Sequence, residues 1–217
     1  MKIHKLVLGM LATNCYIIAN EDTGNAIIID APDEAEKIIS FINEHSYHVK
    51  GIVLTHCHFD HILALEKLKY LTGAPIYTHE SSKRFLYDGI DNLCHYCGIE
   101  WTPVDADVYL TEGSKISLDN TSFEVIYTPG HTSDCICLYG GGILISGDTL
   151  FAGSIGRTDH PTGSMEQEIS SIKNKLLPLP DDTPVYPGHG PETTIGNERR
   201  GNPYLQYIKN QIIPGES

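Results

Sequence analysis

The segment THCHFDH, residues 55–61, directly follows the apolar run Ile52-Val53-Leu54. It carries three histidines and one aspartate at the point where a buried strand is expected to end. Imidazole nitrogens and carboxylate oxygens are ligands that zinc and similar divalent metals take in proteins. A solvated loop with capping histidines does not account for this density, so the segment predicts a metal site. Its candidate ligands are His56, His58, Asp60 and His61. One loop alone cannot complete a metal site, so further ligands are expected elsewhere in the chain.

Three further candidate ligands, His131, Asp148 and His189, also follow predicted strands. These strands span residues 121–127, 142–146 and 184–187. A glycine precedes each candidate, and glycine allows the close backbone approach that a crowded ligand loop needs. Each residue taken singly could be a turn or cap residue. Four such loops at equivalent strand ends favour one shared metal centre.

The hydrophobic pattern predicts strands and amphipathic helices along the whole chain. The remaining strands are expected at 2–8, 13–20, 25–30, 49–54, 75–78, 115–118 and 135–139, and the helices at 33–45, 62–72, 81–87, about 165–176, 192–199 and 203–212. Two blocks of strands, each followed by helices, predict two sheets packed face to face with helices outside. No linker or repeat divides the chain, so we expect one domain over residues 1–217 with a short helical tail from about 203. The rest of residues 80–105 has no clear pattern.

Composition and charge indicate which partners and which cellular compartment to expect. The chain has 28 acidic and 15 basic residues and a formal net charge of −13, which disfavours nucleic acids and anionic membranes as partners. No signal-like start and no membrane-spanning apolar run is present, so we expect a cytoplasmic protein with six reduced cysteines. Cys94 and Cys97 form one isolated CxxC pair, which favours ordinary thiols over a zinc or redox site. Cys135 and Cys137 alternate as small buried residues of a strand would.

Histidines outside these motifs carry weaker signals. His79, after the strand at 75–78, is expected to be a surface or capping residue. No partner spacing marks the others, and we expect solvated positions for His45, His48, His95 and His160.

The four motifs resemble, in content and order, the metal-binding motifs of the metallo-β-lactamase superfamily. The resemblance runs from Asn14 to about residue 203. It implies an α/β (α+β) fold, a four-layer αββα sandwich with a dinuclear centre at one edge. By this resemblance one metal is held by His56, His58 and His131, the second by Asp60, His61 and His189, and Asp148 bridges the two.

Within the superfamily the chain looks most like the glyoxalase II group, which are thioester hydrolases of the hydroxyacylglutathione type. The stretches GDTLFAG (147–153), GRTD (156–159) and VYPGHGPETT (185–194) resemble a short bacterial subgroup. Other members of the superfamily fit less well. A true β-lactamase usually has a cysteine on the second metal and lacks the bridging aspartate, whereas Asp148 fills that place here. A flavodiiron protein has glutamate at the place of His58, and nucleic-acid-processing members carry a large extra domain. The resemblance therefore implies hydrolysis of a small thioester by a hydroxide shared between two divalent ions, zinc in the first instance or else iron or manganese.

Roles beyond metal binding follow from the same resemblance. Asp60 is expected to be catalytic, because it would orient the hydroxide while it holds a metal. Arg157 could bind a substrate carboxylate, although we expect it to pair with Asp159 instead. Tyr16 and Phe151 are expected to wall the substrate pocket.

Two departures leave the substrate open. Glyoxalase II enzymes add a helical domain that binds glutathione, whereas about fifteen residues follow Asn202 here, and an aromatic that those enzymes often place two positions after the last histidine is Pro191. Another small thiol is therefore possible. The motifs THCHxDH and GRTD also occur in persulfide dioxygenases with a single iron, and such an enzyme is the first alternative to a thioester hydrolase. The second alternative is a non-catalytic metal-binding protein. The Pro-Gly-His-Gly-Pro sequence around His189 favours the hydrolase.

Overall fold

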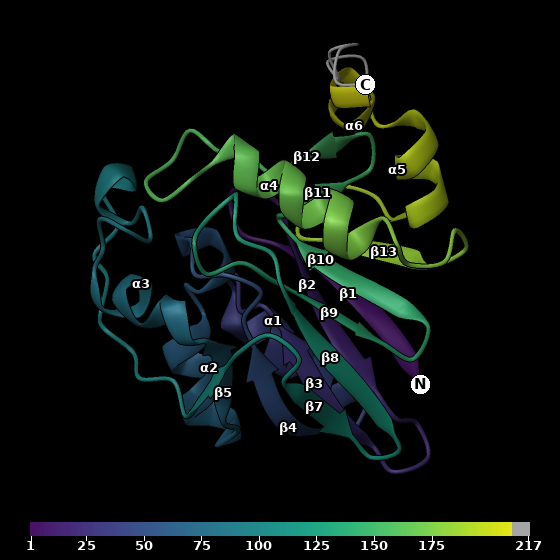
Figure 1. Cartoon of the computed structure of the whole chain (residues 1–217). Helices are drawn as coiled ribbons and strands as arrows, with labels where there is room; N and C mark the ends of the chain where they lie inside the picture. Colours follow the sequence, from purple (N-terminus) through teal and green to yellow (C-terminus); the bar gives the residue numbers. More distant parts are fainter. Residues whose placement is uncertain (210–217) are drawn as a thin grey trace, which may run out of the picture.

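The computed structural model describes residues 1–209, in which two six-stranded sheets pack face to face with helices on both outer faces (Figure 1). The first sheet comes from the first half of the chain and the second sheet from the second half. In Figure 1 the helices of the first half lie on one side of the paired sheets and those of the second half on the other. The predicted αββα sandwich is confirmed.

The first sheet has the strand order β1-β2-β3-β4-β5-β6. Its strands are β1 (Lys2–Leu8), β2 (Thr13–Ala19), β3 (Asn25–Ile29), β4 (His48–Val53), β5 (Ile76–His79) and β6 (Val108–Leu110). The first three pair antiparallel, and β3 to β6 pair parallel. The accompanying helices are α1 (Ala35–Glu44), α2 (Leu65–Thr72) and α3 (Lys83–Tyr87), with 3-10 turns at Phe59–His61, Glu80–Ser82 and His95–Cys97.

The second sheet has the strand order β14-β13-β10-β9-β8-β7. Its strands are β7 (Lys115–Leu118), β8 (Thr121–Tyr127), β9 (Ile136–Gly140), β10 (Ile143–Gly147), β13 (Pro184–Pro187) and β14 (Thr193–Thr194), and a separate hairpin holds β11 (Leu150–Phe151) and β12 (Ser154–Ile155). All neighbours pair antiparallel except β10 and β13. The helices are α4 (Met165–Ser171), which continues as a π-helical turn over Ile172–Leu176, α5 (Ile195–Gly201) and α6 (Pro203–Lys209).

Alternation along the strands divides the core into three layers. In β2, Tyr16 and Ile18 face the layer between the sheets, where they pack in one cluster with residues such as Phe123 of β8. Ile17 faces the opposite way, toward the cluster that also holds Ile38 of α1. A third cluster lies between the second sheet and α4 to α6. Because successive strand residues point to opposite faces, a central strand must be apolar throughout, and every residue of β2 is buried.

The predicted elements are found with small shifts at their ends, but four short strands were not predicted. These are β6, β11, β12 and β14, which have two or three residues each. The predicted helix at 203–212 begins as expected, and its last three residues lie outside the described part of the chain. Within residues 1–209 no helix is both long and apolar enough to cross a bilayer.

Backbone contacts tie the two sheets together at one edge. Thr13, at the start of β2, pairs with His189 in an isolated antiparallel bridge, and Asn14 N donates to Gly188 O at 2.7 Å. Ile136 N of β9 donates to Thr55 O at 2.8 Å. The loops that follow β4 and β13 are thus fixed to the opposite sheet, and this edge carries the candidate site.

Candidate metal centre

The seven predicted ligands lie together at this edge of the two sheets. Each follows the end of a strand: the residues of segment 55–61 follow β4, and His131, Asp148 and His189 follow β8, β10 and β13. Their ligand atoms form three overlapping groups in which all atoms lie within 4.8 Å of one another. The groups are His56, His58 and His131; His56, His61 and Asp148; and Asp60, His61 and His189.

Four buried atoms of this cluster have no hydrogen-bond partner within the described residues. They are His56 Nε2, His58 Nε2, His61 Nε2 and Asp148 Oδ1. A buried polar atom without a partner costs about 1–3 kcal/mol. The ligand atoms of the three groups converge, and several buried polar atoms of the same side chains lack partners, so the donor set fits divalent metal ions.

Two imidazoles of the first group, those of His56 and His58, are held in the neutral form. His58 Nδ1 and His131 Nε2 are 2.9 Å apart, and His131 Nδ1 lies 2.6 Å from the Arg157 carbonyl oxygen. A proton on Nδ1 that is donated to this carbonyl leaves the Nε2 lone pair of His131 facing the group. Burial holds the pKa of His56 and of His58 well below 6.5, so both rings are neutral at pH 7. Neutral imidazole is the form that binds a metal.

The second group is a charged network. Burial disfavours the protonated form of His61, but the carboxylates of Asp60, Asp148 and Asp30 outweigh it and raise the pKa of His61 well above 6.5. In the same way, contacts with Asp148 and Asp60 overcome burial and raise the pKa of His189 to about 9. The pKa of Asp60 is lowered to about 2, because the charge of His61 and the hydrogen bonds from His189 and Thr13 outweigh burial.

Asp148 lies between the two groups. Its Oδ1 is 3.4 Å from His61 Nε2, and its Oδ2 is 3.7 Å from His131 Nε2 and 3.5 Å from His189 Nε2. One carboxylate therefore faces nitrogen atoms of both groups, which is the position that a bridging ligand needs.

Sequence reasoning missed a supporting residue, Asp30, directly after β3. Its carboxylate accepts from His61 Nδ1 at 2.8 Å and also from the backbone N and the Oγ1 of Thr55. It thereby fixes the ring of His61 and the first residue of the ligand loop. Its signal in the sequence is the same as that of the predicted ligands, an acidic residue at a buried strand end, but no glycine precedes it.

Glu168 of α4 is a second supporting residue that the sequence did not reveal. It is fully buried, and its Oε2 accepts from His131 N at 2.8 Å. Burial raises the pKa of Glu168 to about 8. Glu168 thus lies behind His131 and fixes the backbone of its loop.

A cavity of about 730 Å³ opens over the cluster. Candidate ligands that line it include His58, Asp60, Asp148 and His189, and Phe151 and Arg157 lie in its wall. The guanidinium of Arg157 pairs with Asp159 through two hydrogen bonds of 3.0 and 2.8 Å, as preferred from the sequence. The prediction of a fully solvated His160 was wrong: it lines the cavity, half-buried, with its ring centroid 5.4 Å from that of His58.

Tyr16 does not wall this cavity, contrary to the expectation. Its side chain is 1% exposed and packs in the layer between the sheets, and its hydroxyl donates to Pro187 O at 2.8 Å. The alternation of β2 points Tyr16 away from solvent, so that it fixes the strand before His189 instead of contacting a substrate.

The remaining histidines and cysteines lie as expected. His79 accepts from Ser81 N as a cap, and His45, His48 and His95 are exposed. All six cysteines are free; Cys135 and Cys137 are buried, and Cys94 and Cys97 form no disulfide. Cys57, although it lies between two candidate ligands, is buried with its Sγ 3.7 Å from Thr78 Oγ1.

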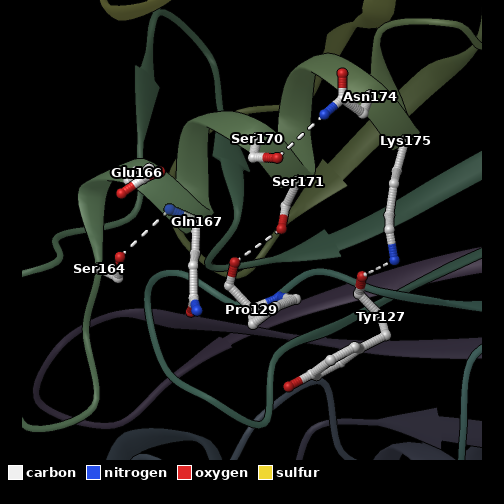
Figure 2. Close-up of a pocket in the computed structure, with 9 residues that line it drawn as sticks. All are labelled: Tyr127, Pro129, Ser164, Glu166, Gln167, Ser170, Ser171, Asn174 and Lys175. Atoms are coloured by element: carbon white, nitrogen blue, oxygen red, sulfur yellow. Dashed lines mark hydrogen bonds between the residues drawn. The ribbon is translucent and has the colours of Figure 1, made fainter.

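A second cavity of about 470 Å³ lies beside α4 (Figure 2). Several of its side chains are hydrogen-bonded to the backbone: Ser171 donates to Pro129 O, Lys175 to Tyr127 O, and Ser164 accepts from Gln167 N. None of its residues belongs to a group that could hold a metal. The cavity over the cluster is therefore the candidate functional site.

Comparison with known proteins agrees with this geometry. Hydroxyacylglutathione hydrolase GloC of Haemophilus influenzae is 38% identical over 213 residues, which cover 94% of this chain and 98% of that protein. The crystal structure of BLEG-1 B3 metallo-beta-lactamase superimposes with a TM-score of 0.90 at 37% identity, covering 94% of this chain and 99% of that one. TTHA1623, solved in a di-iron-bound form, gives a TM-score of 0.82 at 36% identity and covers 93% of this chain and 100% of that one.

The family model for the metallo-beta-lactamase superfamily matches residues 8–189, a range that begins at the end of β1 and ends at the last candidate ligand. With the αββα sandwich and the clustered donors at the sheet edge, this match shows that the chain belongs to the metallo-β-lactamase superfamily.

Proposed function

We propose that this protein is a metal-dependent hydrolase that cleaves a small thioester. The convergence of seven histidine and aspartate side chains below an open cavity carries the proposal. The similarity to hydroxyacylglutathione hydrolase GloC supports the thioester as substrate class.

We further propose that two divalent ions occupy the centre. The first is held by His56, His58 and His131, the second by Asp60, His61 and His189, and Asp148 is shared. Zinc suits this set of imidazoles and carboxylates, and iron or manganese suits it too; the di-iron form of TTHA1623 supports iron as the competitor. Two bound ions supply a water of lowered pKa and polarise the substrate carbonyl.

The side chains of this protein orient the reactants around that chemistry. Asp60 Oδ2 receives a hydrogen bond from Thr13 Oγ1 at 2.8 Å and lies 3.1 Å from His189 Nε2, so its carboxylate is fixed while it faces the cavity. Its carboxylate can accept a hydrogen bond from the attacking water and thereby orient it. His61 is held by Asp30, and His131 by the Arg157 carbonyl. A thiolate is a good leaving group, so no dedicated acid is needed to release it.

One experiment tests the proposal: metal quantification followed by assays on S-lactoylglutathione and uncharged thioesters. We expect two ions per chain and a kcat/KM above about 10⁴ M⁻¹s⁻¹ for at least one thioester. A fully metallated protein that turns over no thioester would overturn the proposal. One iron per chain together with oxygen uptake on glutathione persulfide would replace it with the dioxygenase function.

β-Lactam hydrolysis is a second candidate, because the chain is similar to BLEG-1 B3 metallo-beta-lactamase. Asp148, in the place where true β-lactamases lack a bridging aspartate, argues against it as the main activity. A chromogenic cephalosporin in the same assay separates the two functions: turnover faster than that of every thioester would favour the lactamase.

A further inference from the structure

The rim of the cavity over the metal centre is unusually apolar for exposed surface. Met10 and Leu11, in the connection between β1 and β2, are 72% and 50% exposed, and Tyr96, in the segment after α3, is 66% exposed. All three line the cavity. Water contact with large apolar side chains is unfavourable, and side chains grouped in this way around a cavity mark a surface that binds an apolar ligand.

The apolar lining continues from the rim toward the metal centre. Leu93, Phe151 and Pro161 also line the cavity. The connection that carries Met10 and Leu11 is a defined turn, closed by a hydrogen bond of 3.2 Å from Ala12 N to Gly9 O. The apolar surface is thus presented by two separate loops and extends down to the ligands.

The same cavity offers little to an anionic substrate. Arg157 is the sole lysine or arginine among the described lining residues, and its guanidinium is paired with Asp159. The glutathione part of a thioester carries two carboxylates and one ammonium group, and neither carboxylate has an unpaired cationic partner in this lining.

From these observations we propose that the cavity selects thioesters with an apolar acyl chain and an uncharged thiol part, in preference to glutathione thioesters. This inference rests on the proposed thioester hydrolysis and names its substrate class. Water attacks the carbonyl carbon, the carbon–sulfur bond breaks, and the products are a carboxylate and the uncharged thiol after it takes up a proton.

A matched panel of four thioesters tests the selectivity. The acetyl and hexanoyl thioesters of N-acetylcysteamine and of glutathione vary the length of the acyl chain on each thiol, and they compare a small uncharged thiol with a larger charged one. Each methylene that the rim buries should raise kcat/KM by about two- to fourfold. We expect the hexanoyl ester of N-acetylcysteamine to exceed that of glutathione by roughly tenfold, the loss expected when charged groups are desolvated without a partner. Equal or faster turnover of the glutathione esters would overturn the inference.

Two variants locate the effect at the rim. Met10→Ser and Tyr96→Ser should abolish most of the chain-length dependence, whereas their metal content should equal that of the wild type. The matched control is Tyr70→Ser in α2, where the tyrosine is 86% exposed and does not line the cavity. If both rim variants keep the chain-length dependence of the control, the apolar rim does not bind the acyl chain.

A binding measurement separates this inference from the proposed function. The thioethers S-hexyl-N-acetylcysteamine and S-hexylglutathione cannot be hydrolysed, so their calorimetric affinities for the metallated protein need no turnover. Tighter binding of the uncharged thioether, lost in Tyr96→Ser, supports the selectivity even if hydrolysis of thioesters fails. Tighter binding of the glutathione thioether would contradict the selectivity even if hydrolysis succeeds.

Discussion

Asp60 combines contacts to Thr13 and to His189 with a position in the cavity wall. Asp60→Asn keeps the size of the side chain but removes its charge. We expect kcat/KM for thioesters to fall by about 10²-fold or more, the loss expected when a reactant is no longer positioned, and the content of the second ion to fall as well. Steady-state kinetics with metal quantification measures both.

Asp159→Asn is the control for this change. Asp159 is 68% exposed in its side chain and pairs with Arg157, and it belongs to none of the metal groups. Metal content should not change in this variant. Full activity with two ions in Asp60→Asn would contradict the assigned role of Asp60.

The opposite protonation of the two ligand groups predicts how they take up metal. At pH 7 His61 and His189 carry protons, since their pKa values lie well above 6.5 and at about 9, whereas His56 and His58 do not. A metal must displace those protons. Binding to the second group should therefore release protons and tighten as pH rises toward 9, while the first group should load without proton release from His56 or His58.

Calorimetric titration of the metal-free protein in two buffers of different ionisation enthalpy measures this difference. The enthalpy of the weaker binding step should depend on the buffer, and that of the tighter step should depend on it much less. Buffer-independent enthalpies for both steps would contradict the charge assignment of the second group.

Individual residues were predictable where a local pattern marks them. Each candidate ligand follows a strand within a short motif, and the structure brings all seven together. His160 has no such pattern, because only tertiary packing of its loop places it beside His58. The expectation for Tyr16 was wrong because its alternation with Ile17 along β2 makes it a residue of the core between the sheets.

At the scale of elements, α4 holds the loop that carries His131. Ser164 N donates to Gly130 O, Ser171 Oγ donates to Pro129 O, and Glu168 accepts from His131 N, each at 2.8 Å. The helix itself was predictable from its apolar spacing. Its contact with the loop was not, because a buried glutamate on an amphipathic helix has no distinguishing sequence signal.

Glu168→Gln tests the contact between Glu168 and the loop that carries His131. The pKa of Glu168 in the folded protein is about 8, against 4.5 for the ordinary group, so the folded state favours the protonated carboxyl. Its contribution to stability is fully present below pH 4.5 and is lost as pH rises toward 8. Glutamine can accept the same hydrogen bond without a charge, so the variant should be more stable than the wild type at pH 8, by about 2–4 kcal/mol.

Denaturant unfolding of both metal-free proteins at pH 4.5 and pH 8 measures the effect. The difference in unfolding free energy should be large at pH 8 and close to zero at pH 4.5. A variant less stable than the wild type at pH 8 would mean that the carboxylate is ionised and stabilising there. Glu166→Gln, in an exposed position of the same helix, is the matched control.

Strands and helices of four residues or more were predictable because periodicity needs several residues to appear. β6 has three residues and β11, β12 and β14 have two, which is too short for alternation. β6 and β14 form because a longer neighbour offers its backbone groups, β5 for β6 and β13 for β14, whereas β11 and β12 pair with each other in a hairpin. Their formation is therefore a tertiary effect.

At the scale of the whole molecule, both sheets contribute ligand loops to the same edge. An ion bound there is a link between the two halves of the sandwich and stabilises only the folded chain. At an ion concentration about a thousand times the dissociation constant, the stabilisation is about 4 kcal/mol, and the melting temperature should rise by roughly 8–16 °C for a chain of this size.

Thermal unfolding before and after chelation, and after readdition of zinc, measures this link. Asp60→Asn should show a smaller shift than the wild type, and Asp159→Asn the same shift. A melting temperature that chelation leaves unchanged, in a protein shown to have lost its metal, would contradict the picture of a centre that joins the two sheets.

The candidate ligands come from both halves of the chain, so they are synthesised at different times. His56, His58, Asp60 and His61 precede β5, whereas His189 follows β13, near the end of the described chain. A nascent chain leaving the ribosome therefore exposes four of the seven candidate ligands long before His189 has been synthesised. Complete loading has to wait until the segment after β13 has left the ribosome and the two sheets have packed together.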